Sequence, residues 1–173
     1  MADIDSSVPF IKVTGLKKSF GDQKILKGVD LVIQKGETLV LIGPSGEGKS
    51  VLLKHIIGLL SPDAGKVEME GVDLCSLKER QLSEVRRRMG YLFQSAALFD
   101  SFTVAENVAF PLREAGIRDE AEIDQRVHEA LELVDLEEHK EKMPINLSGG
   151  MRKRVGIARA IIGRPQCILY DEP

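Results

Sequence analysis

Glycine, lysine and serine residues lie close together in one short segment of the chain. Gly43 is followed by four residues, one of them a glycine, and then by a third glycine, a lysine and a serine. The segment comprises Gly43, Pro44, Ser45, Gly46, Glu47, Gly48, Lys49 and Ser50. Glycines let a backbone fold so that several N–H groups point inward. Lysine adds a point charge, and a serine hydroxyl is an oxygen ligand that suits Mg²⁺. This combination predicts a loop that cradles nucleotide phosphates, with Lys49 on the β- and γ-phosphates and Ser50 on Mg²⁺.

The segments on either side of this loop are expected to position it. Residues 38–42 form a short apolar run, typical of a strand buried on both faces. Residues 50–60 have near-helical apolar spacing, and a helix there would direct its free N–H groups and its dipole at the phosphates, with Val51 beside them. A glycine-rich turn without a ligand is the alternative, but such a turn rarely needs both the lysine and the serine. Glu47 is expected to face solvent.

Hydrophobic periodicity predicts an α/β domain spanning residues 1–173. Strands are predicted at residues 10–13, 25–33, 67–70, 89–93 and 167–170. Helices are predicted at residues 83–88, 119–136 and 149–162. Residues 95–147 then form a helical subdomain within the domain.

Two carboxylates, Asp171 and Glu172, follow the last predicted strand. In P-loop nucleotidases, an acid at such a strand end holds Mg²⁺, and a second acid orients or deprotonates the attacking water. Acids often end strands, so the pair becomes strong evidence only beside the phosphate loop.

The order of these motifs resembles that of the ATP-binding cassette (ABC) ATPases. Residues 147–151 are similar to the signature motif of that family, with Met151 where glutamine is usual. The resemblance runs from about residue 10 to the last residue. It implies a P-loop NTPase core with an antiparallel β subdomain and a helical subdomain, with ATP and Mg²⁺ as ligands.

The resemblance also implies roles for individual residues. Phe20 takes the place of the aromatic that stacks on adenine, although tyrosine is commoner there and a core phenylalanine is the alternative. Gln94 matches the glutamine that senses Mg²⁺ and the γ-phosphate. Both Gln94 and Lys49 are expected to take part in catalysis. Asp171 matches the Mg²⁺ ligand and Glu172 the catalytic base. The signature residues close on the γ-phosphate of a second subunit: Ser148, Gly149 and Gly150.

A narrower resemblance covers residues 94–112 and 150–154. Both segments look like those of ATPases that work with Mce-type lipid-transport permeases, although amino-acid importers share much of the pattern. Residues 97–99 are then expected to line a groove for a permease helix, or only to pack the helical subdomain.

Composition limits the other functions. The chain is 43% hydrophobic and 29% charged with a net charge of −3, which does not indicate direct binding of nucleic acid. No segment is apolar enough to span a membrane. Cys75 and Cys167 are expected to be buried thiols, His55, His128 and His139 to be surface residues, and residues 86–88 to form a solvated helix face. The expected location is the cytoplasm, at the inner face of the cell membrane.

The family pattern continues past the last residue, through a D-loop, a further strand and a switch histidine. We therefore expect a piece of a longer ATPase that is inactive or weakly active alone. Because the further strand normally inserts between strands 38–42 and 167–170, both would expose unpaired backbone groups.

The leading hypothesis is the ATPase subunit of a transporter, working as a homodimer or as one of a pair of cassettes with a separate membrane permease. One alternative is a soluble ABC ATPase that acts on DNA or ribosomes. Another is a nucleotide-binding sensor without turnover.

Overall fold

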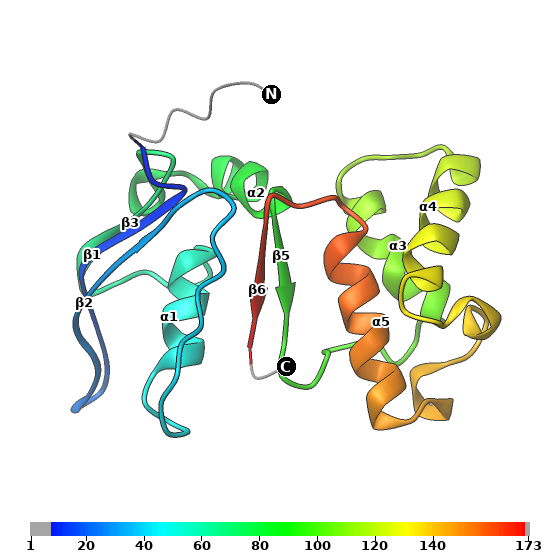
Figure 1. Ribbon diagram of the computed structural model, residues 1–173. Helices are drawn as coiled ribbons and strands as arrows, with labels where there is room; N and C mark the ends of the chain where they lie inside the picture. The colour runs from blue at the N-terminus through cyan, green and yellow to red at the C-terminus, as the bar shows by residue number, and fades with distance from the viewer. Residues whose placement is uncertain (1–7, 172–173) are drawn as a thin grey trace. The chain divides into compact units, whose positions relative to one another are not determined.

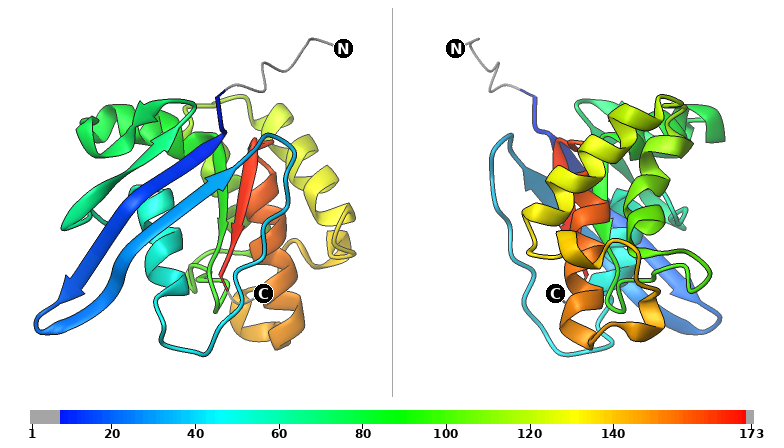
Figure 2. Two further views of the ribbon diagram at one scale, coloured as in Figure 1. Left: turned by 60° about the vertical axis from the view of Figure 1, so that its left-hand side comes forward. Right: turned by 90° about the vertical axis from the view of Figure 1, so that its right-hand side faces the viewer.

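The computed structural model describes residues 8–171, which form two compact units, residues 8–86 and residues 87–171 (Figure 1). An antiparallel sheet forms the frame of the first unit, in the order β2-β1-β3-β4. Its strands are β1 (Ile11–Phe20), β2 (Gln23–Ile33), β3 (Ala64–Met69) and β4 (Val72–Asp73). The buried residues of β1 are Ile11, Val13 and Leu16, with a shift of register between the last two, as in an irregular sheet with one covered face. The strands expected near 10–13, 25–33 and 67–70 are confirmed, and the long β1–β2 hairpin is visible in Figure 2.

Two helices complete the first unit, α1 (Lys49–Ile56) and α2 (Glu79–Arg87). The helix predicted for residues 50–60 ends early, because the N–H groups of Leu59 and Leu60 turn back to the Lys54 carbonyl oxygen. Leu59, expected in the core, is exposed as a result. The short 3-10 turn Leu74–Ser76 joins β4 to α2.

Two surface assignments in this unit are wrong. His55 is fully buried, and its Nδ1 lies 2.7 Å from the Val51 carbonyl oxygen. Arg86 does not belong to a solvated face: its guanidinium donates to the carbonyl oxygens of Ile57 (3.2 Å) and Gly58 (2.7 Å) and pairs with Glu79. These carbonyls follow α1, so the arginine satisfies acceptors that a helix end leaves open.

Residues 38–42 are not the buried strand that their apolar run predicts. They form no strand, and the side chains of Val40 and Ile42 are 72% and 91% exposed. An apolar run becomes a buried strand only when neighbouring strands pair with its backbone. Within residues 8–86, none of the described strands pairs with this segment.

The second unit contains a parallel pair of strands, β5 (Met89–Leu92) and β6 (Cys167–Tyr170). Three helices lie in the connection between them: α3 (Val104–Glu114), α4 (Glu120–Glu132) and α5 (Gly149–Ile161). The 3-10 turns Glu137–His139 and Pro144–Asn146 link α4 to α5. The helices share one core, which includes Val104, Val108, Leu112, Ile123, Val127, Leu131, Leu136, Val155 and Ala158.

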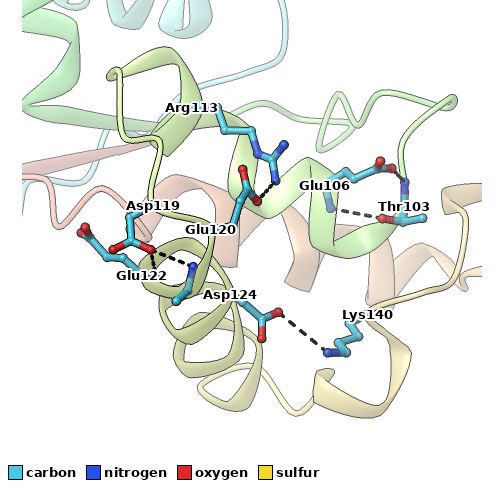
Figure 3. Close-up of polar contacts among 9 residues, drawn as sticks. Thr103, Glu106, Arg113, Asp119, Glu120, Glu122, Asp124 and Lys140 are labelled. Carbon is cyan, nitrogen blue, oxygen red and sulfur yellow. Dashed lines mark hydrogen bonds and ion pairs between the residues drawn. The ribbon is translucent and has the colours of Figure 1, made fainter.

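Capping residues fix the starts of α3 and α4 (Figure 3). The Thr103 hydroxyl accepts a hydrogen bond from the Glu106 N–H while the Glu106 carboxylate accepts one from the Thr103 N–H. Asp119 accepts from the N–H groups at the start of α4. These bonds satisfy donors that a helix N-terminus leaves open.

The burial of the cysteines and of the remaining basic residues differs in part from the expected burial. Cys75 is exposed, not buried, whereas Cys167 is partly buried. Arg88 donates to the Gln166 side chain at 2.6 Å and is therefore not merely solvated. His128 is exposed as expected, while His139 is half-buried. Among residues 8–171, no helix combines the length and apolarity needed to cross a bilayer.

Candidate nucleotide-binding site

The phosphate loop runs into α1 and is held against β2 by a glycine. Gly46 and Gly48 adopt left-handed backbone conformations, with φ values of 85° and 94°. Gly48 is buried and precedes the first residue of α1. A Cβ atom at Gly48 would lie 2.7 Å from Cγ2 of Ile25 and 3.1 Å from Cδ2 of Leu26. Both the conformation and the close approach therefore require glycine.

Lys49 crosses the loop that precedes it. Its Nζ donates to the carbonyl oxygens of Gly43 and Pro44, each at 2.7 Å. The ammonium group is thus held over the loop by neutral acceptors, which a phosphate oxygen can replace with a stronger, charge-assisted partner. Ser50 and Val51 are half-buried in the first turn of α1.

The rest of the loop is open to solvent. Ser45, Gly46 and Glu47 are exposed, as expected for Glu47. The free N–H groups at the start of α1 and its dipole give this end of the helix a positive potential. Together with Lys49, the loop has the donors and the charge to hold a phosphate.

Phe20 ends β1 and is not a core residue. Its ring is 48% exposed, and the Lys18 ammonium lies 5.7 Å from the ring centroid. The alternative of a buried phenylalanine is therefore wrong. An exposed ring in the unit that carries the phosphate loop can offer a face to a flat base.

Asp171 lies in the second unit, directly after β6, and is only 6% exposed. Its N–H donates to the Leu92 carbonyl oxygen at 3.0 Å, and its Oδ2 accepts from the Tyr91 hydroxyl at 3.0 Å. Burial, together with the neighbouring carboxylate, raises the pKa of Tyr91 well above its ordinary value, which keeps the phenol protonated as a donor. Glu172 lies outside the described residues.

Gln94 is exposed and follows β5. The next residues include Ala96 and Ala97, both with positive φ. Arg159 of α5 donates to the carbonyl oxygens of both alanines, at 2.9 Å for Ala97. The segment after Gln94 is therefore tied to the helix that begins at the signature motif.

The signature motif starts α5. The Ser148 hydroxyl caps this helix by accepting from the Met151 N–H at 3.2 Å. Gly149 and Gly150 are exposed in the first turn, and a Cβ at Gly150 would meet no atom within 4 Å. Like the phosphate loop, this motif presents a glycine-rich helix N-terminus to solvent.

The predicted site residues are divided between the two units. Phe20 and residues 43–51 belong to the first, and Gln94, residues 148–150 and Asp171 to the second. Within residues 8–171, no group of three or more His, Cys, Asp or Glu residues could hold a metal ion by itself. Mg²⁺ commonly binds one or two protein oxygens together with water and phosphate, so Ser50 and Asp171 have suitable chemistry.

Sequence reasoning missed Tyr91 and Arg159. Tyr91 stands in a predicted strand with nothing to distinguish it from a packing residue. Its role depends on the register of the β5–β6 pair, which only the structure supplies. Arg159 lies within a helical pattern and was not singled out. The one available signal was a basic residue among the apolar positions of that helix.

A glycine-rich loop before a helix, together with a buried acid after a parallel strand, characterises a P-loop nucleotide-binding protein. Residues 26–173 match the family described as ABC transporter. The chain is 50% identical over 163 residues to the probable ribonucleotide transport ATP-binding protein mkl of Mycobacterium tuberculosis, covering 94% of this chain and 45% of mkl. It is 42% identical over 167 residues to the methionine import ATP-binding protein MetN of Rhizobium johnstonii, covering 96% of this chain and 46% of MetN. The chain belongs to the ABC transporter family and spans about half the length of these relatives.

Solved structures of ATP-binding cassette proteins also resemble this chain. The ATP-binding cassette MJ0796, in a dimeric post-hydrolysis state with ADP and Pi, superimposes with a TM-score of 0.87 at 35% identity. That match covers 93% of this chain and 73% of the other. The cbiO1 protein of Clostridium perfringens, part of the transporter complex cbiONQ, gives a TM-score of 0.82 at 30% identity, covering 96% of this chain and 66% of cbiO1.

Proposed function

We propose that this chain is the ATP-binding and ATP-hydrolysing part of a transporter, acting with a separate membrane permease at the cytoplasmic face. The observation that carries the proposal is the phosphate loop, in which Lys49 lies across Gly43 and Pro44 at the start of α1. Family membership supports the same function. Residues 1–173 would belong to a single cassette domain with residues 95–147 as its helical subdomain.

The chemistry proposed for the site is mainly positioning and charge neutralisation. Loop N–H groups and Lys49 hold the β- and γ-phosphates, and Phe20 stacks on adenine. Ser50 and Asp171 would hold Mg²⁺, which neutralises charge between the phosphates when it is bound. Gln94 senses the γ-phosphate, and Glu172 takes a proton from the attacking water.

A second copy, or a paired cassette, would complete the site. Residues 148–150 present an exposed helix N-terminus that suits the γ-phosphate of a partner. The similar cassette MJ0796 is described as dimeric in its ADP and Pi state, which supports this arrangement.

The proposal also concerns the chemical class of the transported substrate. The similarity of residues 94–112 to ATPases of Mce-type systems favours a lipid. The printed names of mkl and MetN mention ribonucleotide and methionine instead. The permease that binds the chain would decide between these substrate classes.

Co-purification tests the transporter proposal against an ATPase that acts on DNA or ribosomes. The tagged full-length protein is isolated from its native host in mild detergent, and the bound proteins and nucleic acids are identified. We expect an integral membrane permease in an amount close to stoichiometric. Recovery of ribosomes or DNA without any membrane protein would contradict the proposal. A variant with Phe99→Glu, on the exposed ring expected to line the permease groove, serves as the control that should lose the permease.

A further inference from the structure

A hydrogen bond connects the two parallel strands of the second unit at their carboxyl ends. Tyr91 lies in β5 opposite Leu169, and Leu92 lies opposite Tyr170. Asp171 follows at once, so its backbone N–H reaches the Leu92 carbonyl oxygen. The Tyr91 hydroxyl then reaches Oδ2 of the same residue, at 3.0 Å.

The tyrosine is well suited to hold this carboxylate still. Its ring is half-buried and lies 4.4 Å from the Phe93 ring, centroid to centroid. Asp171 is therefore held twice from β5, through its main chain and through one carboxylate oxygen. A neutral donor fixes the orientation of a carboxylate while leaving its negative charge in place for a cation.

We propose that Tyr91 is a positioning residue, whose hydroxyl fixes the orientation of the Asp171 carboxylate, the group that would bind Mg²⁺. This inference rests on the proposed function, in which Asp171 is a ligand of that ion. Partners that orient a metal-binding carboxylate commonly change metal affinity by 10- to 100-fold when they are removed. Tyr91 would therefore act through Asp171 and not as a ligand of the ion.

Substitution of the hydroxyl alone tests the inference. Tyr91→Phe keeps the ring and its packing but removes the donor to Asp171. Affinity for a methylanthraniloyl-labelled ATP analogue is measured by fluorescence while the concentration of MgCl₂ is varied, and again in EDTA. We expect the Mg²⁺ concentration at half-maximal enhancement of binding to rise about tenfold in the variant. Nucleotide affinity in EDTA should stay unchanged.

Tyr170→Phe is the matched control, because it removes a hydroxyl from the exposed residue next to Asp171. It should keep the wild-type Mg²⁺ dependence. An unchanged Mg²⁺ dependence in Tyr91→Phe would overturn the inference while leaving the proposed function standing. Equal losses of affinity with Mg²⁺ and in EDTA would also overturn it, because they would indicate a structural role. A wild-type protein that binds no nucleotide under either condition would overturn both proposals.

Discussion

At the residue scale, Gly48 connects the phosphate loop to the sheet of the first unit. Its left-handed conformation starts α1, and the missing side chain lets the loop approach Ile25 and Leu26 of β2. Lys49 and Ser50, the residues with the chemistry, follow directly. Their positions therefore depend on a neighbour that contributes through its missing side chain and through its carbonyl oxygen, which accepts from the Leu52 N–H at 2.8 Å.

Gly48→Ala should destabilise the protein. The new Cβ would sit 2.7 Å from Cγ2 of Ile25 on a backbone with φ of 94°, so both strain and crowding oppose it. We expect the free energy of unfolding to fall by about 1–3 kcal/mol in urea titrations followed by circular dichroism. Gly43→Ala is the comparison, because its Cβ would meet only Oε2 of Glu47 at 3.6 Å and its φ is not left-handed. Equal stability of Gly48→Ala and the wild type would contradict the packing described here.

Sequence alone predicted the loop but not all of its surroundings. The spacing from Gly43 to Ser50 indicates a phosphate cradle because each residue type has its own chemical reason to be there. The close packing of Gly48 on β2 joins residues far apart in the chain, and local patterns contain no information on such contacts. Tyr91 escaped prediction for the same reason.

At the scale of elements, apolar periodicity located most helices and strands. It failed where contacts with distant segments determine whether a residue or a strand is buried. The β strands near 25–33 and 167–170 and the helix near 149–162 agree with their patterns to within a few residues. Residues 38–42 carry the pattern of a strand, yet in the structure their backbone pairs with no described strand. Burial of His55 could not be predicted either, because it depends on the packing of α1 against segments far away in the chain. Its Nδ1 lies 2.7 Å from the Val51 carbonyl oxygen, one helical turn away.

Asn107 anchors the start of α3 to the segment before it. The side chain is fully buried, accepts from the Phe99 N–H at 2.8 Å, and donates to the carbonyl oxygens of Phe99, Phe102 and Thr103. This side chain forms hydrogen bonds with backbone groups that the loop would otherwise leave unpaired.

Asn107→Ala should therefore lower the free energy of unfolding by about 1–3 kcal/mol, because partly buried backbone groups lose their partner. Chemical denaturation measures the change. Asn146→Ala makes the same substitution at an exposed position in the same unit and should stay within about 0.5 kcal/mol of the wild type. Similar effects of the two substitutions would show that the Asn107 bonds do not stabilise this loop.

At the scale of the whole molecule, the sequence predicted the family more firmly than the arrangement of its parts. The motifs are short and each has its own chemistry, so their order along the chain identifies an ABC protein without any knowledge of packing. How the proposed pair of cassettes and the proposed permease would assemble depends on surfaces, and residues 148–150 are exposed at the start of α5. In the proposed transporter the permease would select the substrate, so the sequence of this chain does not identify that substrate.

Nucleotide binding by the 173-residue chain and by Lys49→Ala tests the assignment of the phosphate loop most directly. Binding of the labelled ATP analogue is measured by fluorescence titration, with Lys54→Ala as the control that removes the same charge later in α1. We expect saturable binding for the wild type and the control, and affinity at least tenfold weaker for Lys49→Ala, because a charge-assisted bond to phosphate is lost. Equal affinity of Lys49→Ala and the wild type, or no saturable binding by the wild type, would contradict the assignment of residues 43–50 as the ATP-binding loop.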